Sequence, residues 1–139
     1  SNGPGDPKDL PEVIENIKKL IGKKPIFGIC LGHQLMALAN GADTYKMKFG
    51  HRGINQPVKY LATGRIYISA QNHGYAVDEK SLEGKGINIS HISMNDGTIE
   101  GLEYTKHPTF TVQYHPEACP GPGDHDYLFK HFVDMMEGR

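Results

Sequence analysis

A cysteine framed by two glycines is the first feature of this sequence that could do chemistry. Residues 28–32 read Gly-Ile-Cys-Leu-Gly after an apolar run, which is the spacing of a nucleophile elbow with cysteine in place of serine. In such an elbow a strand turns abruptly into a helix, and only glycines fit the crowded flanking positions. The helix N-terminus would favour the thiolate of Cys30, and the N–H of Leu31 would face a developing oxyanion. The pentapeptide predicts a reactive thiol, and the alternative is a buried structural cysteine between packing glycines.

A thiolate nucleophile needs a base, and the base needs a group that orients it. The segment 110–114, Phe-Thr-Val-Gln-Tyr, is typical of a strand, and His115, Pro116 and Glu117 follow at its end. Reactive groups gather at strand ends in open α/β sheets. We therefore expect His115 to accept the proton of Cys30 and Glu117 to hold the imidazole tautomer. The alternative is a polar turn after an edge strand.

A metal-binding interpretation of the same region is weaker. Cys30 and His33 have a C-x-x-H spacing, but one pair provides two of the four ligands that a structural zinc requires. The sequence has no second pair at matching spacing. We predict no metal site in this chain.

The surrounding sequence predicts the elements that position these groups. Apolar residues recur at helical spacing over 10–21 and end at Gly22, and 25–29 is typical of a short buried strand. A second helix is expected over 31–40, with Gly41 as its C-cap. Strand-like runs follow at 44–48, 57–60, 65–71, 87–93, 99–104 and 110–114, with a hairpin turn at 95–97 and a closing amphipathic helix at 128–136. The order helix, strand, sharp turn, helix favours an α/β fold with a largely parallel open sheet flanked by helices.

Composition limits the class of protein. The 139 residues suffice for one compact domain and not for two of ordinary size. With 15 basic and 16 acidic residues the formal net charge is −1, which argues against a nucleic-acid or membrane-surface binder. No apolar run approaches the roughly 18 residues of a membrane span. Two cysteines, Cys30 and Cys119, do not make a disulfide framework, so we expect a cytoplasmic protein.

Five stretches together resemble one family. Gly-Ile-Cys-Leu-Gly-His-Gln at 28–34 and the His-Pro-Glu that opens 115–122 resemble the class I (triad) glutamine amidotransferases, whose fold is flavodoxin-like. Lys-Phe-Gly-His-Arg-Gly-Ile-Asn-Gln-Pro-Val at 48–58 and Gln-Asn-His-Gly-Tyr-Ala-Val-Asp at 71–78 are similar to a branch of that family, the small subunits of carbamoyl-phosphate synthetases. The opening Ser-Asn-Gly-Pro-Gly-Asp-Pro agrees with this branch. The resemblance thus runs over nearly the whole chain.

The resemblance implies roles for individual residues. Cys30 is similar to the family's nucleophile, and His115 with Glu117 completes its triad. The oxyanion-hole N–H groups would come from Gly3 and Leu31. Positions that bind glutamine in the family correspond to Gly3, Gly5, Leu31, Gln34, Asn72, Gly74 and Tyr75. Backbone at glycines can approach a small substrate closely, and an amide such as that of Gln34 can pair with its α-amino and carboxylate groups.

The reaction that the resemblance implies has two halves. Cys30 attacks the side-chain amide of L-glutamine, and a glutamyl thioester forms as ammonia leaves with a proton from His115. Water activated by the same base then releases glutamate. In the family the ammonia passes to a large synthetase subunit that consumes ATP and bicarbonate and makes carbamoyl phosphate. The sequence has no G-x-x-x-x-G-K-[ST] loop, so we expect no cofactor in this chain and assign ATP and magnesium to that partner.

Alternatives to this function stay open. The family's amidotransferase domain begins with strands upstream of the loop at 1–7, so we expect 1–139 to be its C-terminal portion, without its N-terminal strands. The chain could instead belong to the amidotransferase of another synthetase, of the GMP or anthranilate type, or be a truncated, inactive docking module. A cysteine hydrolase or chaperone-like relative with a similar elbow would not be expected to retain the stretch at 71–78.

Five further residues are expected to have ordinary roles. His33 is predicted to pack or to hydrogen-bond structurally, and strand alternation is predicted to turn His73 away from the substrate. His51 and Arg52 are predicted to lie in a solvated loop, and the alternative is that they contact a large subunit. Cys119 is expected to be a bystander thiol.

Overall fold

The computed structural model describes residues 5–119 and 123–138. In chain order its elements are the 3-10 helix η1 (Pro7–Asp9), α1 (Pro11–Leu20), β1 (Ile26–Ile29), α2 (Leu31–Ala39), β2 (Thr44–Tyr60), β3 (Ile66–Val77), the 3-10 helix η2 (Glu79–Leu82), β4 (Ile87–Ser93), β5 (Ile99–Tyr104), β6 (Thr109–Val112), the 3-10 helix η3 (Pro116–Ala118) and α3 (Asp126–Met136). The predicted segments 1–4 and 120–122 lie outside the described residues. The predicted helices and most predicted strands are confirmed to within a few residues.

The strands of the described part form one curled sheet in the order β1-β6-β5-β4-β2-β3. Only β1 and β6 pair in parallel, and the other four neighbouring pairs are antiparallel. The expectation of a largely parallel sheet is therefore corrected: the sheet is mixed. The reason is the length of the connections, because the turns between β2 and β3, β4 and β5, and β5 and β6 are too short for the crossover that parallel strands need. The α/β class and the flanking helices are confirmed.

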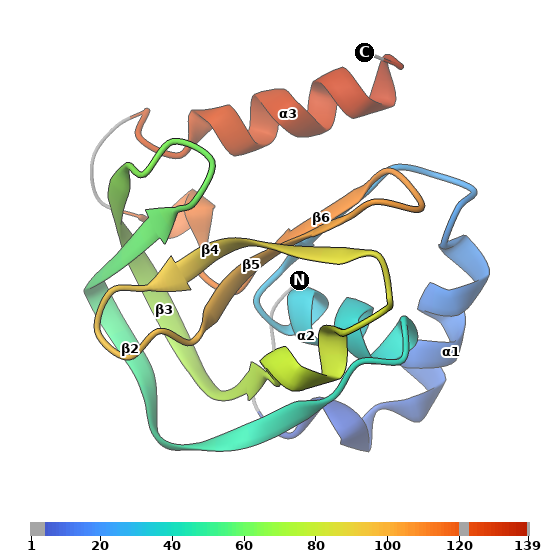
Figure 1. Cartoon of the computed structure of the whole chain (residues 1–139), viewed down its shortest axis with the longest axis horizontal. Helices are drawn as coiled ribbons and strands as arrows, with labels where there is room; N and C mark the ends of the chain where they lie inside the picture. The colour runs from blue at the N-terminus through green and yellow to red at the C-terminus, as the bar shows by residue number, and fades with distance from the viewer. Residues whose placement is uncertain (1–4, 120–122, 139) are drawn as a thin grey trace.

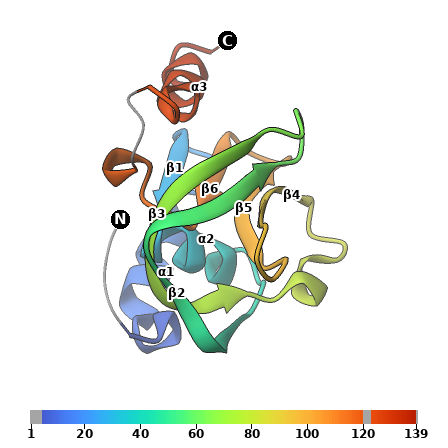
Figure 2. The same ribbon diagram turned by 90° about the vertical axis from the view of Figure 1, so that its left-hand side faces the viewer.

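Helices cover both faces of this sheet. Figures 1 and 2 show α3 on one side of the sheet and α1 and α2 on the other. On the α2 side, Met36 and Ala37 belong to a core cluster that includes Leu102 of β5. On the α3 side, Leu128 packs with Phe110 and Val112 of β6. The sheet is therefore packed on both faces, and the core on the α3 side fixes the position of β6 and of the residues that follow it.

Strand β2 is longer than the sequence pattern indicates. It joins the two predicted strands at 44–48 and 57–60 into one element of 17 residues, paired with β3 through two register irregularities. Gly50 has a φ of +72°, and a Cβ there would lie 2.7 Å from the carbonyl oxygen of His73. Only glycine fits this close approach. The predicted loop around His51 is thus wrong, and that residue lies in the sheet.

Candidate active site

Cys30 occupies the sharp turn between β1 and α2. Its φ of 54° makes it the sole non-glycine residue with a positive φ in the part of the chain that the structure describes, and its ψ is −106°. A Cβ on Gly28 would lie 2.8 Å from Thr111 Cγ2 and 3.0 Å from the carbonyl of Gly32, so a larger residue would collide there. The Cys30 N–H donates to the Val112 carbonyl at 2.9 Å. The elbow conformation predicted for this segment is confirmed.

The Cys30 thiol is buried, with 1% of the residue exposed. Its Sγ lies 3.8 Å from Gln113 Nε2 and 4.0 Å from the Asn72 carbonyl oxygen. Burial raises the pKa of the Cys30 thiol, and the N–H of Leu31 and the amide of Gln113 oppose that rise only in part. Burial thus opposes the lowering of the Cys30 pKa that is expected from the helix N-terminus. The predicted reactivity of the thiol stays a prediction.

His115 and Glu117 form the pair that the sequence predicts. His115 Nδ1 lies 2.9 Å from Glu117 Oε1, and the His115 N–H donates to the Ala70 carbonyl at 2.9 Å. The imidazole is 12% exposed and the carboxylate 52%. With Nδ1–H donated to the carboxylate, Nε2 carries the lone pair and can act as a base. The geometry suits the predicted role, which stays a prediction.

Parallel pairing brings the cysteine and the histidine to one edge of the sheet. Ile29 pairs with Val112, so Cys30 and the segment 113–115 both leave the carboxyl ends of neighbouring strands, where α/β folds place their sites. Within the described residues the polar contacts of Cys30 Sγ are to Gln113 and Asn72, not to His115. Catalytic hydrogen bonds are commonly long before substrate binds. A small movement of the Cys30 thiol or of the His115 ring would be needed to bring the two groups into hydrogen-bond contact.

A cleft of about 440 Å³ opens beside His115. Its walls are Arg52, Gly53, Ile54, Ala70, Gln71, Asn72, His115 and Ala118. Two predicted site residues, Asn72 and His115, therefore line one hollow. A ligand the size of an amino acid could reach the imidazole from it.

The side chain of Gln34 is held by contacts within the protein, and its role in glutamine binding stays a prediction. It is 3% exposed, and its Nε2 donates to the Tyr75 carbonyl at 2.9 Å and to Gln113 Oε1 at 3.0 Å. Both amide hydrogens are thus engaged within the protein, which leaves the amide oxygen as the atom for a substrate amino group. Gln34 therefore ties α2 to β3 at the site.

The other predicted glutamine contacts have less structural support. Gly74 and Tyr75 are half-buried on β3 and Asn72 is exposed on the same strand, while Leu31 begins α2 beside the cysteine. Gly5 is exposed with a φ of +96°, just before η1, which contacts α2. Gly3 lies outside the described residues. The binding roles of these residues stay predictions.

The histidines assigned ordinary roles divide into two groups. His33 is fully buried, its Nδ1 lies 2.7 Å from Thr111 Oγ1, and burial lowers its pKa to about 3, so it is a neutral structural residue as expected. His73 is also buried, in agreement with the alternation. His51 contradicts its prediction, because it is 6% exposed and contacts Asp96 and Glu100.

Two residues near the cysteine were not identified from the sequence as parts of the site. Gln113 is fully buried and contacts both Cys30 Sγ and Gln34. The signal for it was a long polar side chain within the strand-like run directly before His115. Cys119 Sγ donates to the His115 carbonyl at 3.0 Å and accepts the Ala70 N–H at 3.2 Å. It is thus a support for the His115 backbone rather than a bystander.

Comparisons with known proteins identify the family. The family model described as Glutamine amidotransferase class-I matches residues 1–135. The chain is 63% identical over 139 residues to the carbamoyl phosphate synthase small chain of Listeria monocytogenes serotype 4b, covering 100% of this chain and 38% of that protein. It is 64% identical over 137 residues to the protein of the same name from Bacillus cereus, covering 99% of this chain and 38% of that protein. The chain thus spans 38% of the length of these curated relatives.

Solved structures share the fold. A Thermoplasma acidophilum protein described as a candidate GMP synthase component superposes with a TM-score of 0.80 at 20% identity, over 99% of this chain and 70% of that one. A glutamine amidotransferase from Thermotoga maritima gives a TM-score of 0.64 at 21% identity, over 99% and 59%. In the described residues no helix is long and apolar enough to cross a membrane. With a matching family model over 1–135 and this fold around the Cys30 elbow, the chain belongs to the class I glutamine amidotransferase family.

Proposed function

We propose that this chain is the C-terminal portion of a glutamine amidotransferase domain that hydrolyses L-glutamine and supplies ammonia to a large synthetase subunit making carbamoyl phosphate. The observation that carries the proposal is the placement of the Cys30 elbow and the His115–Glu117 pair at the ends of adjacent parallel strands. The relatives at 63–64% identity, which are named carbamoyl phosphate synthase small chain, favour this branch over a GMP or anthranilate type.

The first half-reaction follows from the geometry. Nε2 of His115 accepts the thiol proton while Glu117 holds Nδ1–H. Because burial raises the thiol pKa, the proton leaves Cys30 as the sulfur attacks the amide carbon rather than before. The tetrahedral oxyanion takes a hydrogen bond from the N–H of Leu31, and Gly3 is the proposed second donor. Collapse of this intermediate breaks the C–N bond, and the imidazolium gives its proton to the departing ammonia.

The second half-reaction uses the same groups in reverse. Water loses a proton to His115 Nε2 and attacks the thioester carbonyl, and the C–S bond then breaks. The products are glutamate and the Cys30 thiol, which regains a proton from the imidazolium. The cysteine is thus restored without a cofactor in this chain, and ATP with magnesium is assigned to the large subunit.

The substrate pocket is proposed to lie between α2 and β3. Backbone groups of Asn72, Gly74 and Tyr75 would hold the amino-acid end of glutamine, and the free amide oxygen of Gln34 would accept its amino group. The shared hydrogen bond from Gln34 to the Tyr75 carbonyl keeps these two walls at a fixed spacing.

The large subunit is proposed to dock on the β2 side. Phe49 and Ile54 are 82% and 66% exposed on this strand, and exposed apolar side chains of this size mark contact surfaces. Two free thiols, Cys30 and Cys119, suit a reducing compartment such as the cytoplasm.

Labelling with a diazoketone analogue of glutamine tests the proposal. The purified chain and its complex with the large subunit would be labelled with and without excess glutamine, and the modified peptide mapped. Modification at Cys30 that glutamine prevents is the expected result, with a Cys119→Ser variant as the matched control that still labels. Equal labelling of both cysteines, or none at Cys30 in the complex, would overturn the proposed site and favour a docking module.

A further inference from the structure

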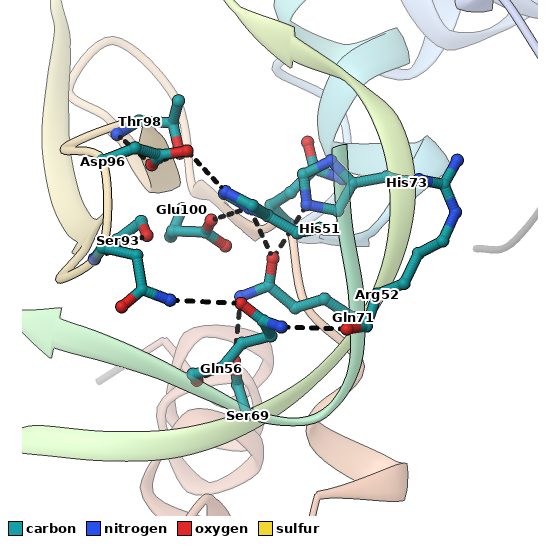
Figure 3. Close-up of polar contacts among 12 residues, drawn as sticks. His51, Arg52, Gln56, Ser69, Gln71, His73, Ser93, Asp96, Thr98 and Glu100 are labelled. Atoms are coloured by element: carbon teal, nitrogen blue, oxygen red, sulfur yellow. Dashed lines mark hydrogen bonds and ion pairs between the residues drawn. The ribbon is translucent and has the colours of Figure 1, made fainter. Parts of the chain in front are cut away.

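Three buried side chains converge next to the strand that carries the predicted glutamine contacts. His51 of β2, His73 of β3 and Glu100 of β5 are 6%, 7% and 0% exposed, and their ligand atoms all lie within 4.8 Å of one another. His51 and His73 are direct cross-strand partners, and Figure 3 shows both rings pointing toward the side chain of Gln71. No spacing motif links positions 51, 73 and 100, which is why no metal site is expected from the sequence.

Both ring nitrogens of His73 face acceptor oxygens, although a neutral imidazole has only one N–H to donate. Its Nδ1 lies 2.8 Å from the Tyr75 carbonyl oxygen, which only accepts, so Nδ1 carries the proton. Its Nε2 then has a lone pair, yet it lies 2.8 Å from Gln71 Oε1, which is also an acceptor. The Gln71 amide is oriented by donation to Ser69 Oγ at 2.9 Å, and that hydroxyl donates to the Gln56 carbonyl at 2.7 Å. Two lone pairs therefore face each other.

His51 also has acceptor atoms facing both of its ring nitrogens. Its Nε2 lies 2.7 Å from Asp96 Oδ2 and carries the proton. Its Nδ1 faces Gln71 Oε1 at 3.0 Å and Glu100 Oε1 at 3.0 Å. The carboxylate of Glu100 is fully buried and contacts His51 Nδ1 through Oε1, and a buried carboxylate needs close polar partners to offset the cost of its desolvation.

We propose that His51 Nδ1, His73 Nε2 and Glu100 bind a divalent transition-metal ion of the zinc class, with the Gln71 amide oxygen or water as the fourth ligand. Two neutral imidazoles and one carboxylate are ligands that zinc accepts. Each histidine donates its other ring N–H to a carboxylate or a backbone carbonyl, which is how metal-binding histidines are normally oriented. An ion between the rings would turn the opposed lone pairs of His73 and Gln71 into ligands and give the buried Glu100 carboxylate a cation to bind.

The proposed ion would hold in place the part of β3 that is proposed to contact the substrate. His73 holds the Tyr75 carbonyl, which also accepts from Gln34, so fixing the ring fixes the part of β3 that carries Asn72 and Gly74. This inference goes beyond the proposed function and does not depend on it, because it concerns binding of an ion rather than glutamine hydrolysis.

Competition with a chromophoric zinc chelator tests the site on the full chain after metal has been removed by dialysis. One equivalent of Zn²⁺ is expected to bind, and Glu100→Gln is expected to weaken binding at least about tenfold. Asp96→Asn, which changes a half-exposed second-layer residue, should weaken it by about 10- to 100-fold. His107→Asn changes a half-buried histidine outside the cluster and serves as the matched control with unchanged affinity.

Cobalt substitution separates this site from the active site. Bound Co²⁺ should give visible bands without sulfur-to-metal charge transfer, and Cys30→Ser should leave the affinity unchanged. Loss of binding in Cys30→Ser with retention in Glu100→Gln would place the ion at the thiol and overturn the proposal. Absence of saturable binding to folded chain would also overturn it, and His51 would then be an imidazolium between Asp96 and Glu100. If Glu100→Gln fails to fold by circular dichroism, Asp96→Asn gives the same decision.

Discussion

The β1–α2 elbow and the β2–β3 ribbon both bury reactive side chains, but they hold them in different ways. The elbow is local, because Cys30 takes its conformation from five consecutive residues and from one parallel neighbour strand. The cluster of His51, His73 and Glu100 is assembled from three strands (Figure 3). Its members lie 22 and 27 positions apart along the chain (73 − 51 and 100 − 73). A site formed by one short segment can be recognised from a sequence motif, whereas a site assembled from separate strands leaves no fixed spacing in the sequence. The same contrast decides which substitutions should affect one region and leave the other unchanged.

Removal of the nucleophile should give the largest effect. Cys30→Ser is expected to lower glutamine hydrolysis by about 10³-fold or more, because the hydroxyl is a poorer nucleophile and the triad acts as a unit. Ammonia release by the protein in complex with its large subunit is the measurement. Cys119→Ser, which removes a support of the His115 backbone, should reduce the rate far less. Equal losses in the two variants would mean that both thiols act structurally.

Loss of the orienting carboxylate should have a smaller effect. Glu117→Gln is expected to lower kcat by about 10²-fold, less than for a buried triad carboxylate, because this one is 52% exposed and water can partly replace it. KM for glutamine should change little, since Glu117 contacts His115 and not the substrate. A change confined to KM would argue that Glu117 binds substrate instead.

The crowding at the elbow predicts a stability effect that a second substitution repairs. Gly28→Ala should destabilise the fold by about 1–3 kcal/mol, because the new Cβ meets Thr111 Cγ2 at 2.8 Å. Thr111→Ser removes that methyl group and keeps the hydroxyl that contacts His33, so the double variant should recover part of the loss. Urea unfolding measures both. Additive losses would show that the collision with the Gly32 backbone dominates.

Two buried histidines outside the cluster of His51, His73 and Glu100 predict acid sensitivity. Burial lowers the pKa of His33 in α2 and of His91 in β4 to about 3, below the unfolded value of about 6.5. The unfolded chain therefore binds more protons, and stability is full above about pH 6.5 and falls as the pH is lowered toward 3. Each histidine contributes a slope of about 1.4 kcal/mol per pH unit in this range.

Unfolding by urea between pH 7 and 4.5 checks this slope. His33→Gln should make the slope shallower, because the variant takes up one proton fewer on unfolding. An unchanged slope in this variant would mean that other groups control acid unfolding.

The smallest effect concerns the free thiol. Since burial raises the pKa of Cys30, a small neutral alkylating agent should label it more slowly at neutral pH than it labels free cysteine. The rate against pH, followed by mass spectrometry, should rise later than for the free amino acid. Rapid labelling at neutral pH would instead show a thiolate held by the helix N-terminus, as the sequence alone suggests.

Local patterns in the sequence predicted most of the elements that surround the elbow. Helix α1, strand β1 and helix α2 lie within a residue of their expected bounds, and β4 and β5 match theirs, because apolar periodicity and glycine stops act over neighbouring residues. The direction of the strands was predicted wrongly, since it depends on connections and pairing rather than on any one segment. The catalytic and glutamine-binding roles rest on motifs and stay predictions.

Long-range packing accounts for what the sequence did not reveal. Polar residues and glycines around Gly50 suggested a loop, but pairing with β3 makes this segment a strand and buries His51. Gln113 and Glu100 are polar residues in apolar runs, and their partners come from other strands and from α2. A buried polar residue in a strand is therefore a useful sign of a site, although it does not name its partners.

The positive φ of Cys30 has a consequence for how this protein can evolve. A non-glycine residue in such a conformation stores on the order of 1–3 kcal/mol of backbone strain, and a glycine there would relieve it. The substitution that relieves this backbone strain is thus one that removes the thiol. Selection for robustness and selection for turnover oppose each other at this single position, a trade-off that cannot be relaxed without moving the nucleophile off the turn.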